Sequence, residues 1–535
     1  MSLRRSTLFR AFVVATTATA LGVVPAAPAQ AVQPAPQVAP VPEFGAGRTN
    51  LDALTIPDLQ RGYDKGSLSP IRITLAYLER IRTVDRKLHA VLKLDNTALL
   101  QALKSEIRHR KGRSLGPLDG VPVLLKDNID TKKLATTAGS RALLGKAPTS
   151  DATLVKRLKA AGAIILGKAN LSEWANFRAN NATSGWSGVG GQTNNPYVLD
   201  RNPCGSSSGS AVGVAASLAQ VAIGTETNGS IVCPSGQNGV VGLKPTLGLV
   251  SRTGVVPITA EQDTAGPIGR HVVDVAITLS ALQGKDRKDA ATGEIPANQT
   301  TDYAKALKGA SLKGKRIGVW RQAGIDPGVD AVVNKAVATI KANGGTVVEV
   351  TVDAGDSGNL SFTAMKSEFV RDLEAYLATR PGQEKTLAQL VAFNERDPIE
   401  LSLMDQGLFE ECLTVPDADH PTIVAARAQA NSLARNAIDS LLKGRKLDAI
   451  ISPTNSTAWK TTYGNGDDFL LGSSGAAAVA GYPNLSVPAG FSGELPIGIS
   501  FIGGRWQDAK ILALGAAFEK AADARKAPKY LPSVG

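Results

Sequence analysis

The chain has 535 residues, of which 43% are hydrophobic and 20% charged, and this composition is typical of a folded globular protein. Its three cysteines are too few for a disulfide scaffold. The formal net charge is +12, but the basic residues are scattered along the chain and are not interleaved with aromatic residues. The charge therefore indicates a solvated surface with loose attraction to anionic partners, and it argues against a nucleic-acid-binding protein.

The N-terminus has the order of a secretory signal. Arg4, Arg5 and Arg10 give a positive start, an apolar stretch follows, and small residues end at Ala31. This order predicts a signal peptide over residues 1–31 that is cleaved after about Ala31, so that the protein is secreted. The apolar stretch is shorter than the roughly 20 residues that a membrane anchor requires. The arginine pair leaves both the Sec and the twin-arginine export route open.

Two further regions follow the signal. Residues 32–47 are rich in proline and alanine and are expected to form an extended lead-in. Residues 48–535 are long enough for one large core or two ordinary domains. No internal repeat and no clear boundary divide them, which favours a single large α/β domain. None of the later stretches is apolar for long enough to span a membrane, so no membrane span is expected after removal of the signal.

The periodicity of apolar residues predicts alternating helices and strands. Ser69-Pro70 should begin a helix, with the serine at the cap and the proline in the first turn, and Asp151 should cap another. In chain order we expect a helix from Ser69-Pro70 to Ile81, a helix over 96–111, a strand over 120–125, a helix over 152–161, strands over 163–166 and 316–320, a helix over 330–342, and strands over 346–352 and 447–451. Strand, helix and strand in succession predict a largely parallel sheet.

Residues 179–242 are dominated by Gly, Ser and Asn and contain two serine-rich segments, 203–210 (PCGSSSGS) and 224–234 (GTETNGSIVCP). Glycine lets the backbone approach a ligand, and a serine beside consecutive backbone N–H groups can attack a carbonyl and hold the resulting oxyanion. Linkers are not followed by a buried apolar run, and neither segment has the Walker phosphate-binding pattern. A nucleophile elbow centred on Ser207 would need a strand directly before it, and residues 200–203 do not predict one.

A serine nucleophile needs a base, and the chain offers histidine or lysine. His89 and His109 lie in predicted helical stretches, whereas His271 and His420 follow the serines, so that a Ser…Asp…His arrangement stays open. Lys126 directly follows a predicted buried strand. Burial at that position would lower the pKa of the Lys126 amine enough for it to act as a neutral base.

Two of the cysteines, Cys204 and Cys233, lie in the two serine-rich segments and could be close in space. The sequence is compatible with a bridge between them that leaves Cys412 over, and equally with buried free thiols. The spacing of the three cysteines fits no zinc site.

Several separated segments resemble the amidase-signature hydrolases. In chain order they are residues 116–128 (GPLDGVPVLLKDN), the segment around Ser206, Gly229-Ser230-Ile231, residues 480–490 (AGYPNLSVPAG) and residues 496–506. The resemblance covers nearly all of the mature chain, and the 24 positions between Ser206 and Ser230 match the family pattern. It implies the α/β amidase-signature fold, a large mixed, mostly parallel sheet covered by helices on both faces.

The resemblance also implies the chemistry. Ser230 would be the nucleophile, Lys126 the base, and Ser206, preceded by a cis peptide, the residue that passes the proton between them. The reaction would pass through an acyl-enzyme on Ser230, with no metal and no cofactor. Backbone N–H groups up to that of Ser230 would bind the substrate oxyanion, and the substrate-binding positions are Thr227, Asn228 and Gly229.

Some positions depart from the family pattern. Cys204 and Ser208 stand where the family usually has glycine, and Asn228 replaces the first glycine before the nucleophile. Residues 170–176 (NLSEWAN) and 225–234 are most similar to the peptide-amidase branch, which removes a C-terminal amide from peptides.

The predicted function is therefore a secreted amidase that hydrolyses a small-molecule or peptide amide, with a C-terminal peptide amide as the leading substrate, to an acid and ammonia. Esterase or aryl acylamidase activity at the same site stays open, and so does an inactive secreted binding protein on the same scaffold. Export and the lack of a tRNA-binding signal argue against a transamidase role, and no nucleic-acid partner is expected. The sequence does not reveal the physiological amide, the oligomeric state or the acyl-pocket residues, for which Trp459, Tyr463 and Phe469 are candidates.

Overall fold

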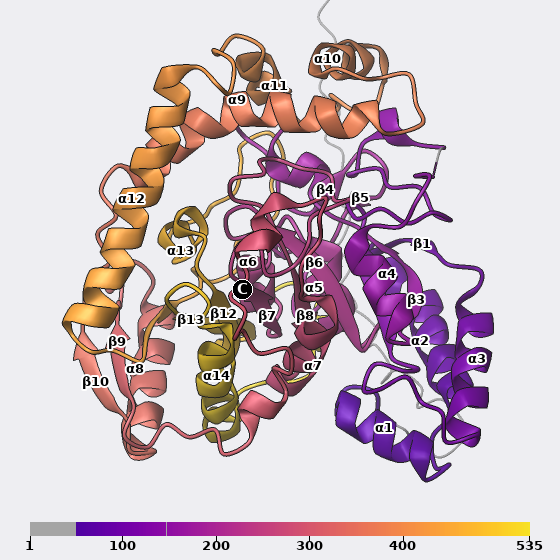
Figure 1. Cartoon of the computed structure of the whole chain (residues 1–535), viewed down its shortest axis with the longest axis vertical. Coiled ribbons are helices and arrows are strands. Elements are labelled where there is room, and N and C mark those ends of the chain that lie inside the picture. The colour runs from indigo at the N-terminus through magenta and orange to yellow at the C-terminus, as the bar shows by residue number, and fades with distance from the viewer. Residues whose placement is uncertain (1–49, 146, 535) are drawn as a thin grey trace, which may run out of the picture. The chain divides into compact units, whose positions relative to one another are not determined.

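The structure, a computed structural model, describes residues 50–145 and 147–534. The predicted signal peptide (1–31) and lead-in (32–47) lie outside the described residues. From Asn50 onward the chain forms one structural unit (Figure 1).

An 11-stranded sheet runs through this unit, and two short strands, β4 (Trp186–Ser187) and β5 (Gly191–Gln192), form a separate pair. From one edge of the large sheet to the other, the strands are β1 (Val91–Leu94), β3 (Ile164–Ala169), β2 (Pro122–Lys126), β6 (Val221–Glu226), β8 (Thr264–Gly269), β7 (Val241–Lys244), β12 (Asn484–Ser492), β13 (Leu495–Ile502), β11 (Ala449–Pro453), β9 (Arg316–Val319) and β10 (Thr346–Glu349).

Helices surround the sheet (Figure 1). They are α1 (Ile56–Asp64), α2 (Pro70–Val84), α3 (Ala98–Arg110), α4 (Thr153–Ala160), α5 (Ser208–Ala215), α6 (Val232–Gln237), α7 (Val272–Leu282), α8 (Pro327–Ala342), α9 (Ser357–Ala378), α10 (Leu387–Arg396), α11 (Gly407–Cys412), α12 (Pro421–Gly444), α13 (Gly475–Ala480) and α14 (Asp508–Ala522).

Both faces of the sheet are covered. Successive residues of a strand point to opposite faces. On β12, Leu485 lies directly against Gly515 of α14, whereas Ser486 faces Gly498 of β13, which in turn lies against Gly236 of α6. Helices α14 and α6 therefore cover opposite faces, and the predicted α/β fold with a mixed sheet and helices on both sides is confirmed.

The prediction that the sheet is mostly parallel is wrong. Only the pairs β3–β2, β2–β6, β11–β9 and β9–β10 are parallel, and the other six are antiparallel. The strand–helix–strand pattern correctly describes the parallel pairs β2–β3 and β9–β10, which have α4 and α8 between their strands. At the centre, however, only two residues join β12 to β13. A parallel pairing needs a crossover connection, so a two-residue turn forces these strands to be antiparallel.

The predicted elements occur within a few residues of their expected bounds, with one difference at a helix start. The Ser69 side chain accepts a hydrogen bond from the backbone N–H of Arg72, and Pro70 opens α2 as expected. Asp151, in contrast, does not cap α4, because Ala152 occupies the cap position. The Asp151 carboxylate instead pairs with Lys159 at 2.8 Å.

An aromatic cluster joins the long helix α9 to the segment around residue 174. Trp174 packs edge-on against Phe409 of α11, with ring centroids 5.7 Å apart, and Phe177 lies 4.9 Å from Phe369 of α9. These side chains are buried in one cluster. The cluster therefore packs the segment around residues 174–177 against helices α9 and α11.

Candidate active site

Lys126 and the end of β6 lie side by side at the carboxyl ends of two neighbouring strands of the sheet. Lys126 is the last residue of β2, and Glu226 is the last residue of β6. The two strands pair in parallel, so their carboxyl ends lie side by side, which is where open α/β sheets place their ligand sites. Ser206 precedes α5 and Ser230 lies between β6 and α6, so both serines enter the site on turns next to these strand ends.

Lys126 is fully buried and touches Ser206 directly. Its Nζ donates to Ser206 Oγ at 2.7 Å and to Thr225 Oγ1 at 2.8 Å. Burial lowers the pKa of the Lys126 amine to about 7, against the opposing effect of the Asp263 and Glu226 carboxylates. A buried amine with this pKa can be neutral near physiological pH and can accept a proton from a hydroxyl group.

Backbone hydrogen bonds link the two serine segments. The N–H of Ser207 donates to the carbonyl oxygen of Ser230 at 3.1 Å, and Ser207 Oγ donates to the carbonyl oxygen of Thr225 at 3.0 Å. Ser206 follows the expected cis peptide, and its carbonyl oxygen accepts from the N–H of Ser172 at 3.0 Å. Ser206 is fully buried, whereas Ser230 keeps 8% of its surface exposed. Ser230 is therefore the more accessible of the two serines.

Residues 227–230 form a turn whose backbone donors are free. Among the hydrogen bonds within residues 50–145 and 147–534, none is donated by the N–H groups of these four residues. The next two N–H groups, of Ile231 and Val232, are both bound by Glu226 Oε2, at 2.8 and 3.0 Å. Gly229 has φ +81°, a left-handed conformation that favours glycine. Adjacent free donors beside a serine hydroxyl are suited to binding an oxyanion.

Asp263 is a buried residue of the site that the sequence pattern did not indicate. Its carboxylate accepts from Thr227 Oγ1 at 2.5 Å and from the N–H groups of Ile258 and Thr259 at 2.8 and 3.0 Å. Burial raises the pKa of Asp263 to about 6. The side chain thus fixes the start of the 227–230 turn. No local signal marks it, because a single acid at the beginning of a strand has no distinctive neighbours.

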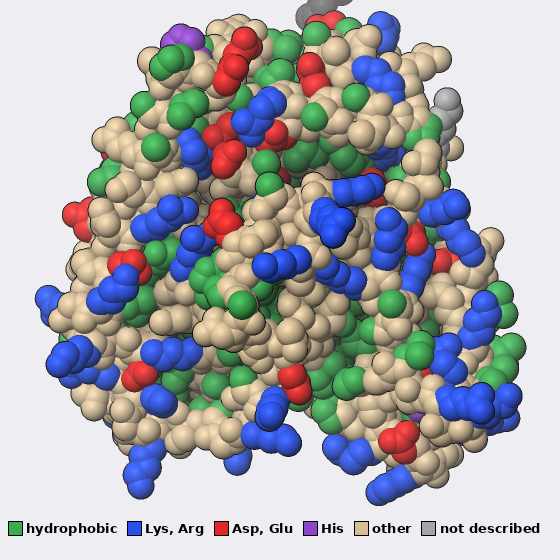
Figure 2. All heavy atoms as spheres, in the orientation of Figure 1, with side chains coloured by type: hydrophobic (Ala, Val, Ile, Leu, Met, Phe, Trp, Pro, Cys, Tyr) green, Lys and Arg blue, Asp and Glu red, His purple; other side chains and the backbone are tan. Residues whose placement is uncertain are grey.

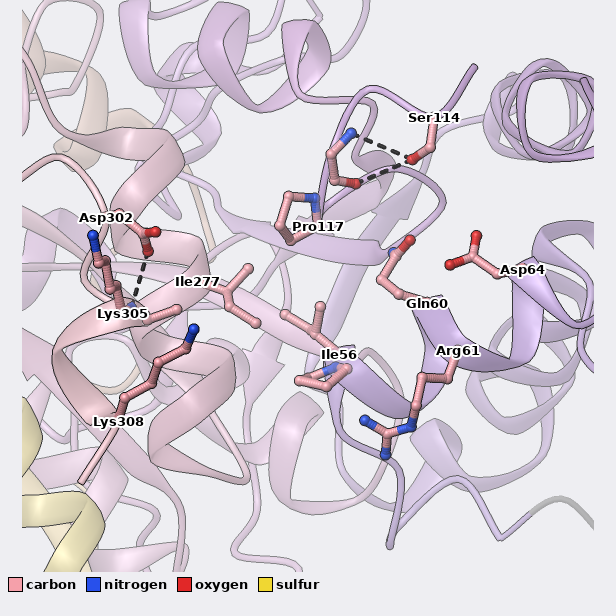
Figure 3. A pocket seen from close by; sticks show the side chains of 13 residues that line it. Ile56, Gln60, Arg61, Asp64, Ser114, Pro117, Ile277, Asp302, Lys305 and Lys308 are labelled. Atoms are coloured by element: carbon pink, nitrogen blue, oxygen red, sulfur yellow. Dashed lines mark hydrogen bonds between the residues drawn. The ribbon is translucent and has the colours of Figure 1, made fainter. Parts of the chain in front are cut away.

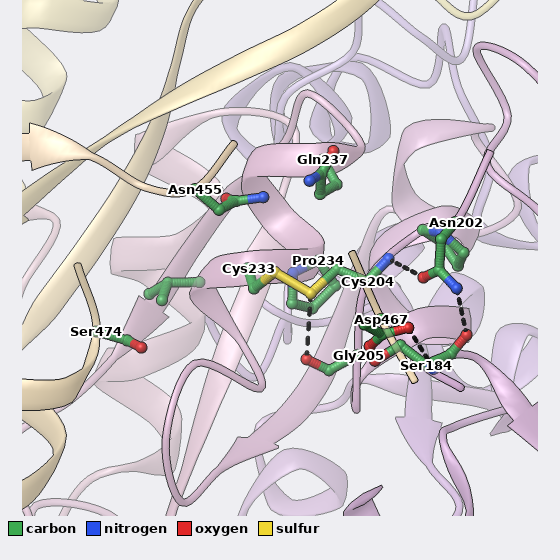
Figure 4. The surroundings of a disulfide bond; sticks show 12 residues. Ser184, Asn202, Cys204, Gly205, Cys233, Pro234, Gln237, Asn455, Asp467 and Ser474 are labelled. Atoms are coloured by element: carbon green, nitrogen blue, oxygen red, sulfur yellow. Dashed lines mark hydrogen bonds between the residues drawn. A yellow bond between two sulfur atoms is a disulfide. The ribbon is translucent and has the colours of Figure 1, made fainter. Parts of the chain in front are cut away.

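Cys204 and Cys233 form a disulfide, with their Cα atoms 6.0 Å apart, and Cys412 is a buried free thiol. The bond joins the segment before Ser206 to the first turn of α6, just after Ser230 (Figure 4). The sequence did not decide whether these two cysteines pair, and the structure shows that they do. Cys204 has φ +57°, in the left-handed region that glycine adopts most easily, which gives a physical reason for the glycine that the family usually has there.

A buried ion-pair cluster supports the segment next to Ser206. Arg178 Nη1 lies 2.6 Å from Glu173 Oε1 and 3.0 Å from Glu400 Oε2, and all three side chains are at most 2% exposed. Burial raises the pKa of Glu173 well above its usual value, against the effect of Arg178. Glu173 follows Ser172, whose N–H binds the carbonyl of Ser206. The sequence motif 170–176 contains Glu173, but nothing in it indicates the distant partner Glu400.

The histidines do not contact the serines. Within the part of the chain that the structure describes, no hydrogen bond or ion pair joins a histidine to Ser206 or Ser230. His89 lies outside any α-helix, with φ +51°, His109 is in α3, and His271 and His420 occupy the cap positions of α7 and α12. The Ser…Asp…His alternative therefore has no support in the geometry.

The three aromatic candidates for the acyl pocket divide into two kinds. Trp459 is buried against the disulfide and donates through Nε1 to Asp467 at 3.3 Å. Phe469 packs edge-on against Trp459, with centroids 6.0 Å apart, yet remains 45% exposed, and Tyr463 is 43% exposed. Trp459 is thus a packing residue beneath the site, while Phe469 and Tyr463 offer apolar surface to solvent.

A cavity of about 570 Å³ lies elsewhere, between α1, Pro117, α7 and residues 302–308 (Figure 3). None of the predicted site residues lines it.

Among residues 50–145 and 147–534, no group of three or more His, Cys, Asp or Glu side chains is arranged to hold a metal ion. In the same part of the chain, no helix is both long and apolar enough to cross a membrane.

Comparisons with known proteins agree with the predicted family. Residues 72–512 match the family model for Amidase, and this range includes Lys126, Ser206 and Ser230. The chain is 40% identical over 504 residues to a probable amidase of Arabidopsis thaliana, and the alignment covers 90% of this chain and 92% of the relative. The similarity therefore extends over nearly the whole of both proteins.

Solved structures agree as well. The native peptide amidase of Stenotrophomonas maltophilia superposes with a TM-score of 0.85 at 44% identity, covering 89% of this chain and 99% of that one. An amidase family protein from Bacillus anthracis superposes with a TM-score of 0.81 at 35% identity, covering 89% of this chain and 92% of that one. The chain therefore belongs to the amidase family and is an amide-hydrolysing enzyme.

Proposed function

We propose that the enzyme uses a Ser-Ser-Lys triad, with Ser230 as nucleophile, Ser206 as proton relay and Lys126 as base. One observation carries this proposal: the buried Nζ of Lys126 lies 2.7 Å from Ser206 Oγ, and burial lowers the pKa of that amine to about 7. A charged, solvent-exposed lysine could not accept a proton at neutral pH, whereas this one can.

The reaction begins when Ser230 Oγ attacks the carbonyl carbon of the amide. The Ser230 proton passes to Ser206 Oγ as the Ser206 proton passes to Lys126, and the oxyanion is held by the free N–H groups of residues 227–230. The C–N bond then breaks, and the protonated lysine returns its proton through Ser206 to the leaving nitrogen. Ammonia departs and leaves an ester on Ser230. Water, deprotonated by the same relay, hydrolyses the ester and restores the enzyme.

The substrate is proposed to be the C-terminal amide of a peptide. Support comes from the 44% identity with the S. maltophilia peptide amidase. The exposed Asn228, hydrogen-bonded at 2.7 Å to Ser474, and the partly exposed Phe469 and Tyr463 offer polar and apolar surface to a chain longer than a simple amide. Secretion, as the N-terminal sequence predicts, would expose the enzyme to such peptides outside the cell.

The test is the rate of hydrolysis of an amidated peptide, free amino-acid amides, a primary aryl amide and the ester of the same peptide, followed as ammonia release for the amides and as alcohol release for the ester. Ser230→Ala and Lys126→Ala are each expected to lower kcat/KM for the preferred amide by at least about 10³-fold. Ser210→Ala is the matched control, because this buried serine of the same segment donates to the carbonyl of Ile223 and does not contact Lys126.

Each alternative makes a different prediction. A fluorophosphonate should label Ser230 in the wild type and not in Ser230→Ala, whereas an inactive binding protein would label in neither. Preferred turnover of the ester or the aryl amide would replace the peptide-amide proposal while leaving the triad intact. Full activity in Lys126→Ala would overturn the triad itself.

A further inference from the structure

Helix α3 carries an apolar face that nothing in the described chain, residues 50–145 and 147–534, covers. The face consists of four side chains, which we call the α3 patch: Leu99, Leu100, Leu103 and Ile107 are 41%, 51%, 43% and 44% exposed. Single exposed leucines are ordinary on a protein surface, but four on one short helix are not.

The four side chains of the α3 patch lie on one face of the helix. Leu99, Leu103 and Ile107 are four positions apart, so they lie above one another along the helix, with Leu100 beside them. The opposite side of α3 holds the buried residues that pack it onto the protein, Ala98, Ala102, Ser105 and Glu106. Helix α3 therefore packs on the protein through small and polar side chains, and its large apolar side chains face solvent.

The charges around the patch are almost all positive. Lys104, Arg108 and Arg110 lie on α3, and Lys111 and Arg113 follow directly. Arg108 pairs with the buried Asp119 and Arg110 with Glu106, so the cations that remain for a partner are Lys104, Lys111 and Arg113. The single acid of this stretch, Glu106, is 8% exposed, and its carboxylate is bound by Ser69 Oγ and Arg110. Figure 2 shows the result at the outer edge of the molecule over α3, where apolar side chains stand among Lys and Arg side chains.

We propose that the α3 patch docks on an anionic lipid surface, with the leucines entering the headgroup region and the basic side chains pairing with lipid phosphates. A helix that presents an apolar face bordered by Lys and Arg is the pattern of interfacial membrane binding. A second copy of the chain fits less well, because a two-fold contact through α3 would place the same basic border on both sides.

The docking is separate from the active site. Helix α3 packs on α2 and β3 near the β1 edge of the sheet, and none of its residues contacts Lys126, Ser206 or Ser230. The proposal therefore does not depend on the catalytic mechanism, and changes in the α3 patch should leave turnover of a water-soluble amide intact.

The test is co-sedimentation of the protein, purified after expression of the full chain, with vesicles of phosphatidylcholine and phosphatidylglycerol. The variant Leu99→Ser/Leu103→Ser/Ile107→Ser is expected to bind at least about tenfold more weakly than the wild type. Lys104→Gln and Lys111→Gln are each expected to weaken binding by about fivefold and to reduce its dependence on salt. Unchanged thermal unfolding midpoints show that these variants fold.

The matched control is Leu413→Ser/Val424→Ser, which removes apolar side chains that are 43% and 54% exposed outside α3. It should bind the vesicles as the wild type does. Equal binding by the patch variant and the control would overturn the proposal, as would equal binding to vesicles of phosphatidylcholine alone. A dimer in sedimentation velocity that the patch variant abolishes would assign the face to a second copy instead.

Discussion

The disulfide between Cys204 and Cys233 ties together the two turns that carry the serines, and its removal should affect stability and catalysis together. The double variant Cys204→Ala/Cys233→Ala removes the bond without leaving a free thiol in either segment. The two cysteines are 4–5% exposed and are separated by 29 positions in the sequence. The closed loop contains both proposed catalytic serines, α5, β6 and the 227–230 turn, so the bond restricts this part of the site in the unfolded chain.

The magnitude follows from chain entropy. For a separation of 29 positions, closing the loop in the unfolded state is worth about 3.5 kcal/mol at 25 °C. We therefore expect the double variant to lose about 3.5 kcal/mol of unfolding free energy. In the folded state the two turns are held additionally by the Ser207–Ser230 backbone bond. Because a displacement of about 1 Å can cost about 100-fold in rate, kcat should fall between about tenfold and 100-fold, with KM changing less.

The assay is reversible urea unfolding followed by tryptophan fluorescence, with kcat and KM measured on the same samples. A dithiol reductant should lower the wild-type midpoint to that of the double variant and leave the double variant unchanged. Cys412→Ala is the control, since Cys412 is a free buried thiol, and it should keep the response to the reductant. A double variant that unfolds within about 1 kcal/mol of the wild type and retains full kcat would refute the reasoning.

Three further predictions concern the proposed base, Lys126, and the residues around the site. Because burial lowers the pKa of Lys126 to about 7 and only the neutral amine accepts a proton, kcat/KM should fall about tenfold per pH unit below pH 7 and level off above it. Thr225→Val removes the Oγ1 that accepts from Lys126 Nζ at 2.8 Å. The lost hydrogen bond no longer stabilises the charged amine, so the pKa of Lys126 should fall. The acidic limb of the pH profile, where kcat/KM decreases, should therefore move to lower pH, and kcat should be reduced. Gly205→Ala would place a Cβ 2.1 Å from Ser172 Oγ, and the resulting overpacking should cost about 1–3 kcal/mol of stability in a thermal unfolding experiment.

Each of these has an outcome that contradicts it. A pH profile whose limb lies near pH 10 would mean that Lys126 is not perturbed by burial. A limb in Thr225→Val that coincides with that of the wild type would mean that Oγ1 does not hold the charged amine. For Gly205→Ala, an unchanged unfolding midpoint would mean that Ser172 can move aside, even though its Oγ accepts from the N–H of Gly185 at 2.8 Å.

The sequence by itself determined the parts of this protein that depend on neighbouring residues. The apolar run that ends at Lys126 predicted a buried strand and a buried amine, and the structure has both. The Gly- and Ser-rich segments indicated turns beside the serines that are proposed to react. The ordered series of motifs identified the family, because several separated segments in one order are far more specific than any single segment.

Only the tertiary structure decided which distant segments meet. The antiparallel centre of the sheet, the Cys204–Cys233 bond, the Asp263 carboxylate under Thr227 and the pairing of Glu400 with Arg178 all join residues that are far apart in the chain. Periodicity reports only which face of one element is buried, and a lone acid or cysteine has the same local pattern whether it is paired or free. These contacts arise when the strands assemble and desolvate their neighbours, which is also the step that lowers the pKa of Lys126.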